Sequence, residues 1–219
     1  MSVLAIDYGK SKFGYAIGSL FVSESGTLRT SDIMSKVKNF QKIVLGLPLS
    51  MSGNYSTQTF EVIRFALKLK KMGKEVLLID ERMTTKMAKT FEKKDDDRFS
   101  AEQLLFEYIQ NPHRAIEFRI IEVLEQKSIS CNLALFIEAP YCESYQIDNG
   151  IGYTKDPYIA YTLFNKGFFV YRVWKDFQEA IEKLEQSPDL IIIENGNRQL
   201  LSDLGLENAT IESVSLVVK

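Results

Sequence analysis

The spacing of hydrophobic positions changes several times along the chain, and each change marks an expected element of secondary structure. Between short apolar runs, apolar residues recur at steps of three and four, which is typical of helices buried on one face. This alternation of strands and helices predicts an α/β protein. The short apolar runs typical of buried strands lie at 3–6, 42–47, 75–79, 132–137 and 190–193.

The first half of the chain predicts a mixed sheet flanked by helices. Three consecutive antiparallel strands are expected at 3–6, 13–18 and 19–30, with a tight turn around Gly9 after the first. Asn111 and Pro112 are expected to break a helix. The other elements expected here are strands at 42–47 and 75–79 and helices at 32–39, 56–72, 84–93, 100–110 and 115–126.

The pattern restarts after about residue 127 and predicts a second, small and mainly parallel α/β sheet. A long loop is expected at 138–152. We therefore expect two domains, 1–126 and 127–219. The elements expected in the second domain are strands at 132–137, 168–173, 190–193 and 213–218 and helices at 156–165, 177–185 and 198–204.

Charge separates the two segments. The chain of 219 residues has a net charge of −2, and its 45% hydrophobic and 26% charged residues exclude a disordered chain, a collagen-like fibre and a coiled coil. Residues 1–125 carry 19 Lys and Arg against 16 Asp and Glu, whereas residues 126–219 carry 8 against 13. Phosphate binding requires positive charge, so the first segment is the better candidate for a nucleic-acid contact.

Cysteine and histidine are scarce, which restricts the chemistry. Cys131 and Cys142 have no zinc-binding spacing, and His113 is the only histidine, so neither a zinc centre nor a Ser-His-Asp triad is expected. A metal would be held by oxygen ligands, which favours Mg²⁺ or Mn²⁺. The N-terminus does not resemble a signal peptide and no apolar run reaches 18 residues, so a cytoplasmic protein without a membrane span is expected.

Acidic residues follow two of the expected strands and precede one expected helix. Asp7 ends the first strand, Glu81 follows the strand at 75–79, and Asp95, Asp96 and Asp97 precede a helix. Such acids also serve as plain helix caps. The carboxyl ends of parallel strands share one edge of a sheet, so these groups could meet there. A carboxylate cluster of this kind favours a divalent cation, which supports phosphoryl chemistry.

Four segments in this order resemble the motifs of the YqgF/RuvX family of Holliday junction resolvases and pre-16S rRNA nucleases. This resemblance covers about the first 110 residues and implies an RNase H-like fold. Residues after about 127 have no counterpart in the family, and the stretch between Thr85 and Asp97 is shorter than the family pattern. The matching segments are 5–16 (AIDYGKSKFGYA), 43–53 (IVLGLPLSMSG), 78–85 (LIDERMTT) and 97–105 (DRFSAEQLL).

The resemblance assigns roles to individual residues. It implies that Asp7, Glu81 and Asp97 are catalytic metal ligands, with the third ligand open among Asp95, Asp96 and Asp97. Lys12 stands at a position where the family usually has arginine. A lysine there keeps the positive charge but cannot bind a phosphate in the bidentate manner of arginine. The nucleic-acid contacts expected in this way are Gly9, Lys12, Arg82, Thr84, Thr85 and Lys86.

The first hypothesis is therefore a nuclease that uses Mg²⁺ or Mn²⁺ and hydrolyses structured nucleic acid, either precursor 16S rRNA or a Holliday junction. A second hypothesis is a nucleic-acid-binding module that has lost turnover. A third is a sugar-kinase-like or actin-like ATP-binding protein, which would need a longer chain and a second phosphate loop. The second domain is expected to serve dimerisation or docking, so a homodimer is among the expected assemblies.

Overall fold

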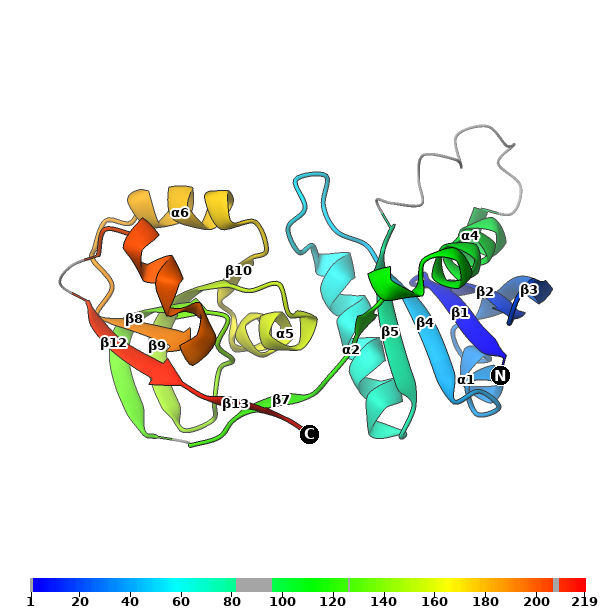
Figure 1. The fold of residues 1–219 in the computed structure, drawn as a ribbon, viewed down its shortest axis with the longest axis horizontal. Helices are drawn as coiled ribbons and strands as arrows, with labels where there is room; N and C mark the ends of the chain where they lie inside the picture. The colour runs from blue at the N-terminus through cyan, green and yellow to red at the C-terminus, as the bar shows by residue number, and fades with distance from the viewer. Residues whose placement is uncertain (1, 82–95, 126, 207–208) are drawn as a thin grey trace. The chain divides into compact units, whose positions relative to one another are not determined.

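The computed structural model describes residues 2–81, 96–125, 127–206 and 209–219. The chain forms two compact units (Figure 1). The first comprises Met1–Met51 and Ser56–Phe118, and the second comprises Ser52–Tyr55 and Arg119–Lys219. The expected division into domains 1–126 and 127–219 stays a prediction.

The first unit is built on a six-stranded mixed sheet with the strand order β3-β2-β1-β4-β5-β6. The β1, β4 and β5 strands run parallel, while β2, β3 and β6 pair antiparallel with their neighbours. The expected mixed sheet is confirmed. Its strands are β1 (Val3–Tyr8), β2 (Lys12–Gly18), β3 (Val22–Arg29), β4 (Lys42–Leu47), β5 (Glu75–Asp80) and β6 (Ile116–Glu117).

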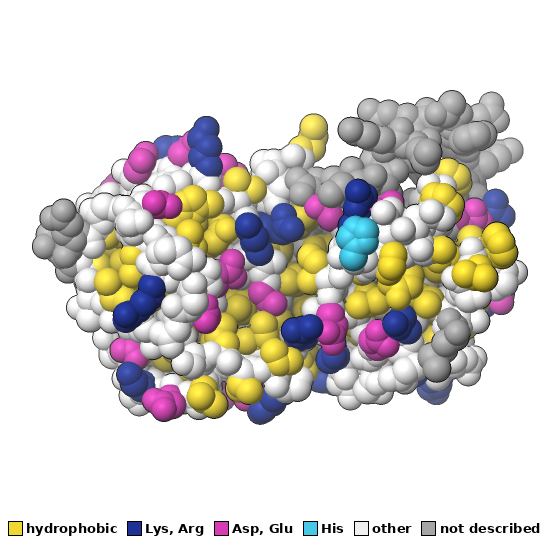
Figure 2. All heavy atoms as spheres, in the orientation of Figure 1, with side chains coloured by type: hydrophobic (Ala, Val, Ile, Leu, Met, Phe, Trp, Pro, Cys, Tyr) yellow, Lys and Arg dark blue, Asp and Glu magenta, His cyan; other side chains and the backbone are white. Residues whose placement is uncertain are grey.

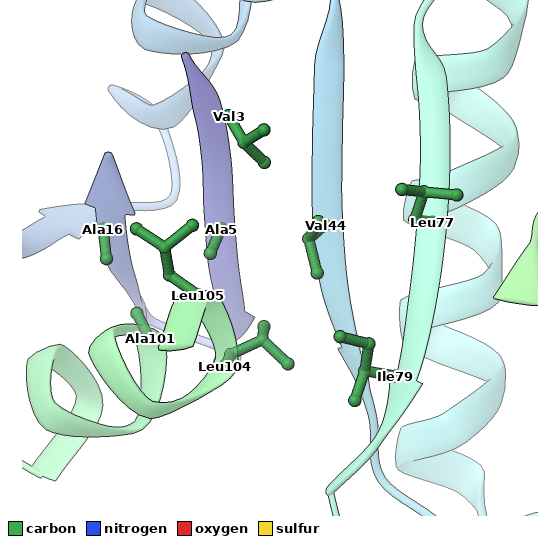
Figure 3. Close-up of a cluster of buried hydrophobic side chains, with 9 residues drawn as sticks. All are labelled: Val3, Ala5, Ala16, Val44, Leu77, Ile79, Ala101, Leu104 and Leu105. Carbon is green, nitrogen blue, oxygen red and sulfur yellow. The ribbon is translucent and has the colours of Figure 1, made fainter. Parts of the chain in front are cut away.

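Helices cover both faces of this sheet, together with the short α1 (Ile33–Val37). On one face, α4 (Asp96–Gln110) packs against β1, β2 and β3. Figure 3 shows side chains from α4, including Leu104 and Leu105, on the same side as Val3 and Ala5. On the opposite face lies α2 (Thr57–Lys71), whose Phe65 ring contacts Tyr8. The alternation of side chains along β1 therefore separates two cores.

The start of α2 is encoded locally. Ser56 is its N-cap, and the Ser56 and Thr59 side chains accept hydrogen bonds from each other's main-chain N–H groups. This capping box satisfies donors that the first turn of a helix leaves free. After the helix, Gly73 adopts a positive φ of 77°, which suits glycine. The expected helix at 56–72 is confirmed.

The expected helix at 115–126 is wrong. After α4 the chain forms a short 3₁₀ turn, η2 (Pro112–Arg114), and then β6 and β7 (Ile121–Val123). The β6 strand pairs with the edge of β5, and the Phe118 N–H donates to the carbonyl of Val76. Pairing at an open sheet edge, together with β-branched isoleucines, overrides the helical spacing. The helix expected at 84–93 lies outside the described residues.

The second unit contains a five-stranded, wholly parallel sheet with the order β10-β9-β8-β11-β12. The expected small parallel α/β domain is confirmed. In addition, β7 pairs antiparallel with β13 (Leu216–Val218). The strands of the parallel sheet are β8 (Ile129–Ile137), β9 (Tyr145–Tyr153), β10 (Phe169–Tyr171), β11 (Leu190–Glu194) and β12 (Thr210–Val214).

Helices lie on both faces of this sheet as well. Phe177 and Ile181 of α6 (Trp174–Glu182) pack on one face, together with side chains of the 3₁₀ helix η3 (Asn195–Asp203). On the other face, α5 (Pro157–Lys166) brings Leu163 against the backbone of Gly152. The sheet is thus doubly wound.

The long loop expected at 138–152 is wrong in its second half, which forms β9. Tyr145 and Ile147 are buried and alternate with exposed Gln146 and Asp148, a strand pattern. Polar residues at 148–150 conceal that pattern in the sequence. Within the described parts of the chain, every helix is too short or too polar to cross a membrane.

Candidate active site

The carboxyl ends of β1 and β5 bring two acidic residues to one edge of the first sheet. Asp7 lies in β1 and Glu81 directly follows β5. The parallel β4 strand lies between them and pairs with both. Asp7 alternates with Val3 and Ala5 on the face covered by α4. The topology therefore places Asp7 and Glu81 at the same edge of the sheet, on strand ends separated by β4.

Gly46 of β4 makes room for the Glu81 carboxylate. A Cβ atom built on Gly46 would lie 2.0 Å from Glu81 Oε1. The Glu81 side chain therefore folds back over the β4 backbone, between the ends of β5 and β1. A larger residue at 46 would displace the carboxylate.

Gly14 of β2 performs a similar role for the start of α4. It pairs in register with Asp7, and a Cβ atom built on it would lie 1.7 Å from the main-chain carbonyl oxygen of Asp97. The backbone of Asp97 therefore packs directly on β2, beside the strand position of Asp7. Two glycines thus let main chain and carboxylate approach the sheet closely.

The surroundings of Glu81 favour its neutral, protonated form. Burial, followed by repulsion from Asp7 and Asp80, raises the pKa of Glu81 to about 8. Burial penalises the charged form, and nearby like charges add to that penalty. The ionised pair of Asp7 and Glu81 would be stabilised by a cation.

The three expected metal ligands are brought together only in part. Asp7 and Glu81 interact, and the backbone of Asp97 lies beside Gly14. Within the described residues, however, no group of three His, Cys, Asp or Glu side chains is arranged to hold a metal ion. Asp95 lies outside the described residues, and the side chain of Asp96 is not described. The choice of third ligand stays a prediction.

Two cations lie opposite each other near the same edge. Lys12 begins β2 and pairs in register with Arg29, the last residue of β3. The register places both on the face of Asp7, because Asp7 pairs with Gly14 and Gly14 with Thr27. Both residues are exposed, and neither forms an ion pair with another described residue. Arg29 was not expected from the sequence, because only the strand register reveals its position.

The charge of the described surface is mixed, whereas Lys12 and Arg29 are two like charges on paired positions. On the face shown in Figure 2, the described Lys and Arg side chains are interspersed with Asp and Glu. Like charges directly opposite each other on a sheet are destabilising unless a counter-charge is present. Lys12 and Arg29 therefore form a suitable contact for an anionic group such as a phosphate.

The remaining expected contact residues fall into two groups. A Cβ atom on Gly9 would lie 2.2 Å from the carbonyl oxygen of Lys12, so the β1–β2 turn itself requires glycine there. The other expected contacts lie outside the described residues, and these are Arg82, Thr84, Thr85 and Lys86.

The strand order β3-β2-β1-β4-β5, with acidic residues at the ends of β1 and β5, defines an RNase H-like protein. The family comparison agrees with this class. The model of the RuvX family, described as Holliday junction resolvase, matches residues 1–111, and the chain belongs to this family.

Curated relatives extend the comparison. A protein of Thermotoga maritima named "Putative pre-16S rRNA nuclease" is 30% identical over 194 residues, which is 82% of this chain and 84% of the relative. Relatives of the same name from Alcanivorax borkumensis and Rickettsia typhi are 36% and 35% identical, over 44% and 41% of this chain. The match covers 84% of the Alcanivorax protein and 65% of the Rickettsia protein. The similarity to the Thermotoga protein therefore extends well into the second unit, so the expectation that residues after about 127 have no counterpart is wrong.

Proposed function

We propose that the protein is a metal-dependent nuclease that hydrolyses phosphodiester bonds in structured nucleic acid. The observation that carries the proposal is the meeting of Asp7 and Glu81 at the carboxyl edge of a RuvX-type sheet. The names of the relatives suggest precursor 16S rRNA as substrate, and the family description suggests a Holliday junction. Both substrates present the same phosphodiester chemistry.

The donor set fits a hard divalent cation. Carboxylate oxygens are the ligands that Mg²⁺ and Mn²⁺ prefer, and Glu81 has a raised pKa that a cation would lower. Asp7 and Glu81 would hold the ion together with a third acid at the start of α4, for which we propose Asp97. When bound, such an ion supplies activation of water and neutralisation of charge on the phosphate.

The protein's own residues would orient the substrate. Lys12 and Arg29 would bind a phosphate on the α4 face, which their pairing in register supports, and the arginine could do so with two parallel hydrogen bonds. Arg82, Thr84, Thr85 and Lys86 complete the proposed contact by family resemblance. These groups would hold the scissile bond near the carboxylates, which is the main contribution of positioning to phosphoryl transfer.

The test is cleavage of a substrate panel by the full chain. The panel contains a precursor 16S rRNA fragment, a four-way DNA junction and linear duplexes, each with Mg²⁺, Mn²⁺ or chelator. Asp7→Asn is expected to lower cleavage by at least about 10²-fold, because it removes a charged ligand, while substrate binding is retained. Asp32→Asn is the matched control, because Asp32 is an exposed acid whose side chain does not cap α1.

The outcomes separate the hypotheses. Cleavage that survives Asp7→Asn would contradict the proposed mechanism. Binding without cleavage of any substrate would instead favour the module that has lost turnover. The same preparations test the expected homodimer by sedimentation, and cell fractionation tests the expected cytoplasmic location.

A further inference from the structure

The second unit contains a short piece of chain that the sequence order would assign to the first. Ser52–Tyr55 lies between β4 and α2, yet it belongs to the second unit. The chain leaves the first unit after Met51 and returns to it at Ser56. The contacts of Asn54 and Tyr55 described below all lie within the second unit.

Asn54 makes three hydrogen bonds to residues around the start of α6, and its Nδ2 also donates to Oγ of Ser52, at 3.3 Å. Its Oδ1 accepts from the main-chain N–H groups of Arg172 and Val173, at 2.8 and 3.0 Å. Its Nδ2 donates to Oδ2 of Asp176, at 2.5 Å. The partners settle the orientation of the amide, because two donors face its oxygen and a carboxylate faces its nitrogen.

These bonds lie at the start of α6. Its N-cap residue is Val173, whose side chain has no acceptor for the free N–H groups. Asp176 is the third residue of the helix, the position that normally accepts from the N-cap N–H in a capping box. Asn54 stands between these two groups and bonds to both. A residue distant in sequence thus links the N–H group of the N-cap residue to the carboxylate of Asp176.

Tyr55 adds a second contact on the same edge of the parallel sheet. Its hydroxyl donates to the carbonyl oxygen of Thr154, at 3.2 Å. Thr154 follows β9 and Arg172 follows β10, so both bonding positions lie at carboxyl ends of strands. Doubly wound sheets generally bind their ligands at this edge. Here the edge holds residues 54 and 55 of the same chain.

The other end of the β4–α2 segment adjoins the candidate active site. The β4 strand ends at Leu47, which pairs in register with Asp80, the residue before Glu81. Only residues 48–51 separate this strand end from the piece held by the second unit. This segment is therefore held at one end by sheet pairing and at the other by Asn54. The Ser56 and Thr59 hydroxyls also donate to the carbonyl of Pro48.

We infer that the second unit is a docking domain for the chain's own β4–α2 segment, and that Asn54 is a positioning residue for the nuclease site. The positioning role of Asn54 rests on the proposed function. The docking role of the second unit rests on the hydrogen bonds of Asn54 and Tyr55 alone.

The experiment exchanges the two side chains of the Asn54–Asp176 hydrogen bond. Asn54→Asp places a second carboxylate against Asp176. Because the two like charges repel each other, residue 54 is expected to lose its contacts there, and hydrogen exchange at the amides of Arg172 and Val173 is expected to accelerate about tenfold. Cleavage of the preferred substrate is expected to fall by a similar factor. Adding Asp176→Asn restores a donor opposite the carboxylate, so the double variant is expected to recover both. Met51→Ala is the control, because that side chain is fully exposed in the same segment.

The docking role and the positioning role are contradicted by different results. Unchanged exchange in Asn54→Asp, or no recovery in the double variant, would overturn the docking role. Faster exchange with unchanged cleavage would overturn the positioning role. If the unmodified protein cleaves no substrate, the proposed function fails and the positioning role fails with it, while the exchange measurement still decides the docking role.

Discussion

Burial and the proposed chemistry place opposite demands on the Glu81 carboxylate. A metal ligand should be ionised, yet burial and the neighbouring acids raise the pKa of Glu81 to about 8. The absence of a side chain at Gly46 leaves room for the group at the sheet edge despite that cost. The residue is thus placed where it is unfavourable for the metal-free fold, as is common at functional sites.

This conflict predicts a pH dependence of stability in the metal-free protein. The pKa of Glu81 is about 8 when folded and 4.5 in the reference state, so between these values the folded state binds a proton that the unfolded state lacks. The free energy of unfolding contributed by Glu81 is therefore complete below about pH 4.5 and falls as pH rises toward 8.

Denaturant unfolding in chelator at several pH values measures this effect. Glu81→Gln removes the titration, so its advantage over the unmodified protein should grow between pH 5 and 8. Mg²⁺ should stabilise the unmodified protein at pH 8 more than the variant. A constant difference between the two proteins across this range would contradict the assignment.

The sequence alone identifies some of these residues and misses others for physical reasons. Asp7 and Glu81 follow apolar strands, and parallel strands share a carboxyl edge, so their meeting could be predicted. Arg29 could not, because its place opposite Lys12 depends on the register of two strands. The proposed third ligand could not be assigned from the sequence either, because three consecutive acids, Asp95, Asp96 and Asp97, precede or begin the helix.

At the scale of elements, two glycines on the same face allow the sheet to approach different partners. A Cβ atom on Gly14 would meet the main chain of Asp97, whereas one on Gly46 would meet the end of a flexible side chain. The first contact joins β2 to α4, and the second joins β4 only to the Glu81 carboxylate. The consequences of substitution should therefore differ.

Gly14→Ala should destabilise the fold by about 1–3 kcal/mol, because β2 and α4 must separate to admit the methyl group. Gly46→Ala is the matched variant, and it should leave the free energy of unfolding unchanged or raise it by up to about 1 kcal/mol. It should nevertheless lower cleavage by about 10²-fold, because the carboxylate moves by about an ångström or more. Denaturant unfolding and cleavage assays on both variants separate the two effects.

Elements were predictable where one face is buried and the spacing is regular, as in α2 and β4. The predictions failed at 115–126 and at 138–152. In the first region the open edge of β5 selects a strand, and in the second polar residues interrupt a pattern that pairing with β8 completes. Both errors arise where a partner strand, distant in sequence, decides the local structure.

At the scale of the whole molecule, the chain passes between the two units more often than a two-domain sequence suggests. The change in charge and the restarted strand pattern indicate two units. They do not indicate that residues 52–55 belong to the second, because the partners of Asn54 near the start of α6 lie 118 to 122 residues away. Contacts of such separation leave no local pattern.

We expect residues 1–118 to fold alone, because the sheet and both covering helices lie within them. The fragment should unfold cooperatively, while the amides of residues 52–56 should exchange faster than in the full chain, since Arg172 and Val173 are absent. Hydrogen exchange and thermal unfolding measure both effects. A fragment without a cooperative transition would show that the two units share one core, and residues 1–126 provide the comparison.

The antiparallel pairing of β7 with β13 has a mechanical consequence. Val218 pairs with Ile121, and the N–H of Lys219 donates to the carbonyl of Ile120, so residues 119 and 219 leave this ladder at the same end. A pulling force applied between them would open the ladder one hydrogen bond at a time, as a zipper opens. The parallel sheet would therefore bear no load until the β7–β13 pair had separated.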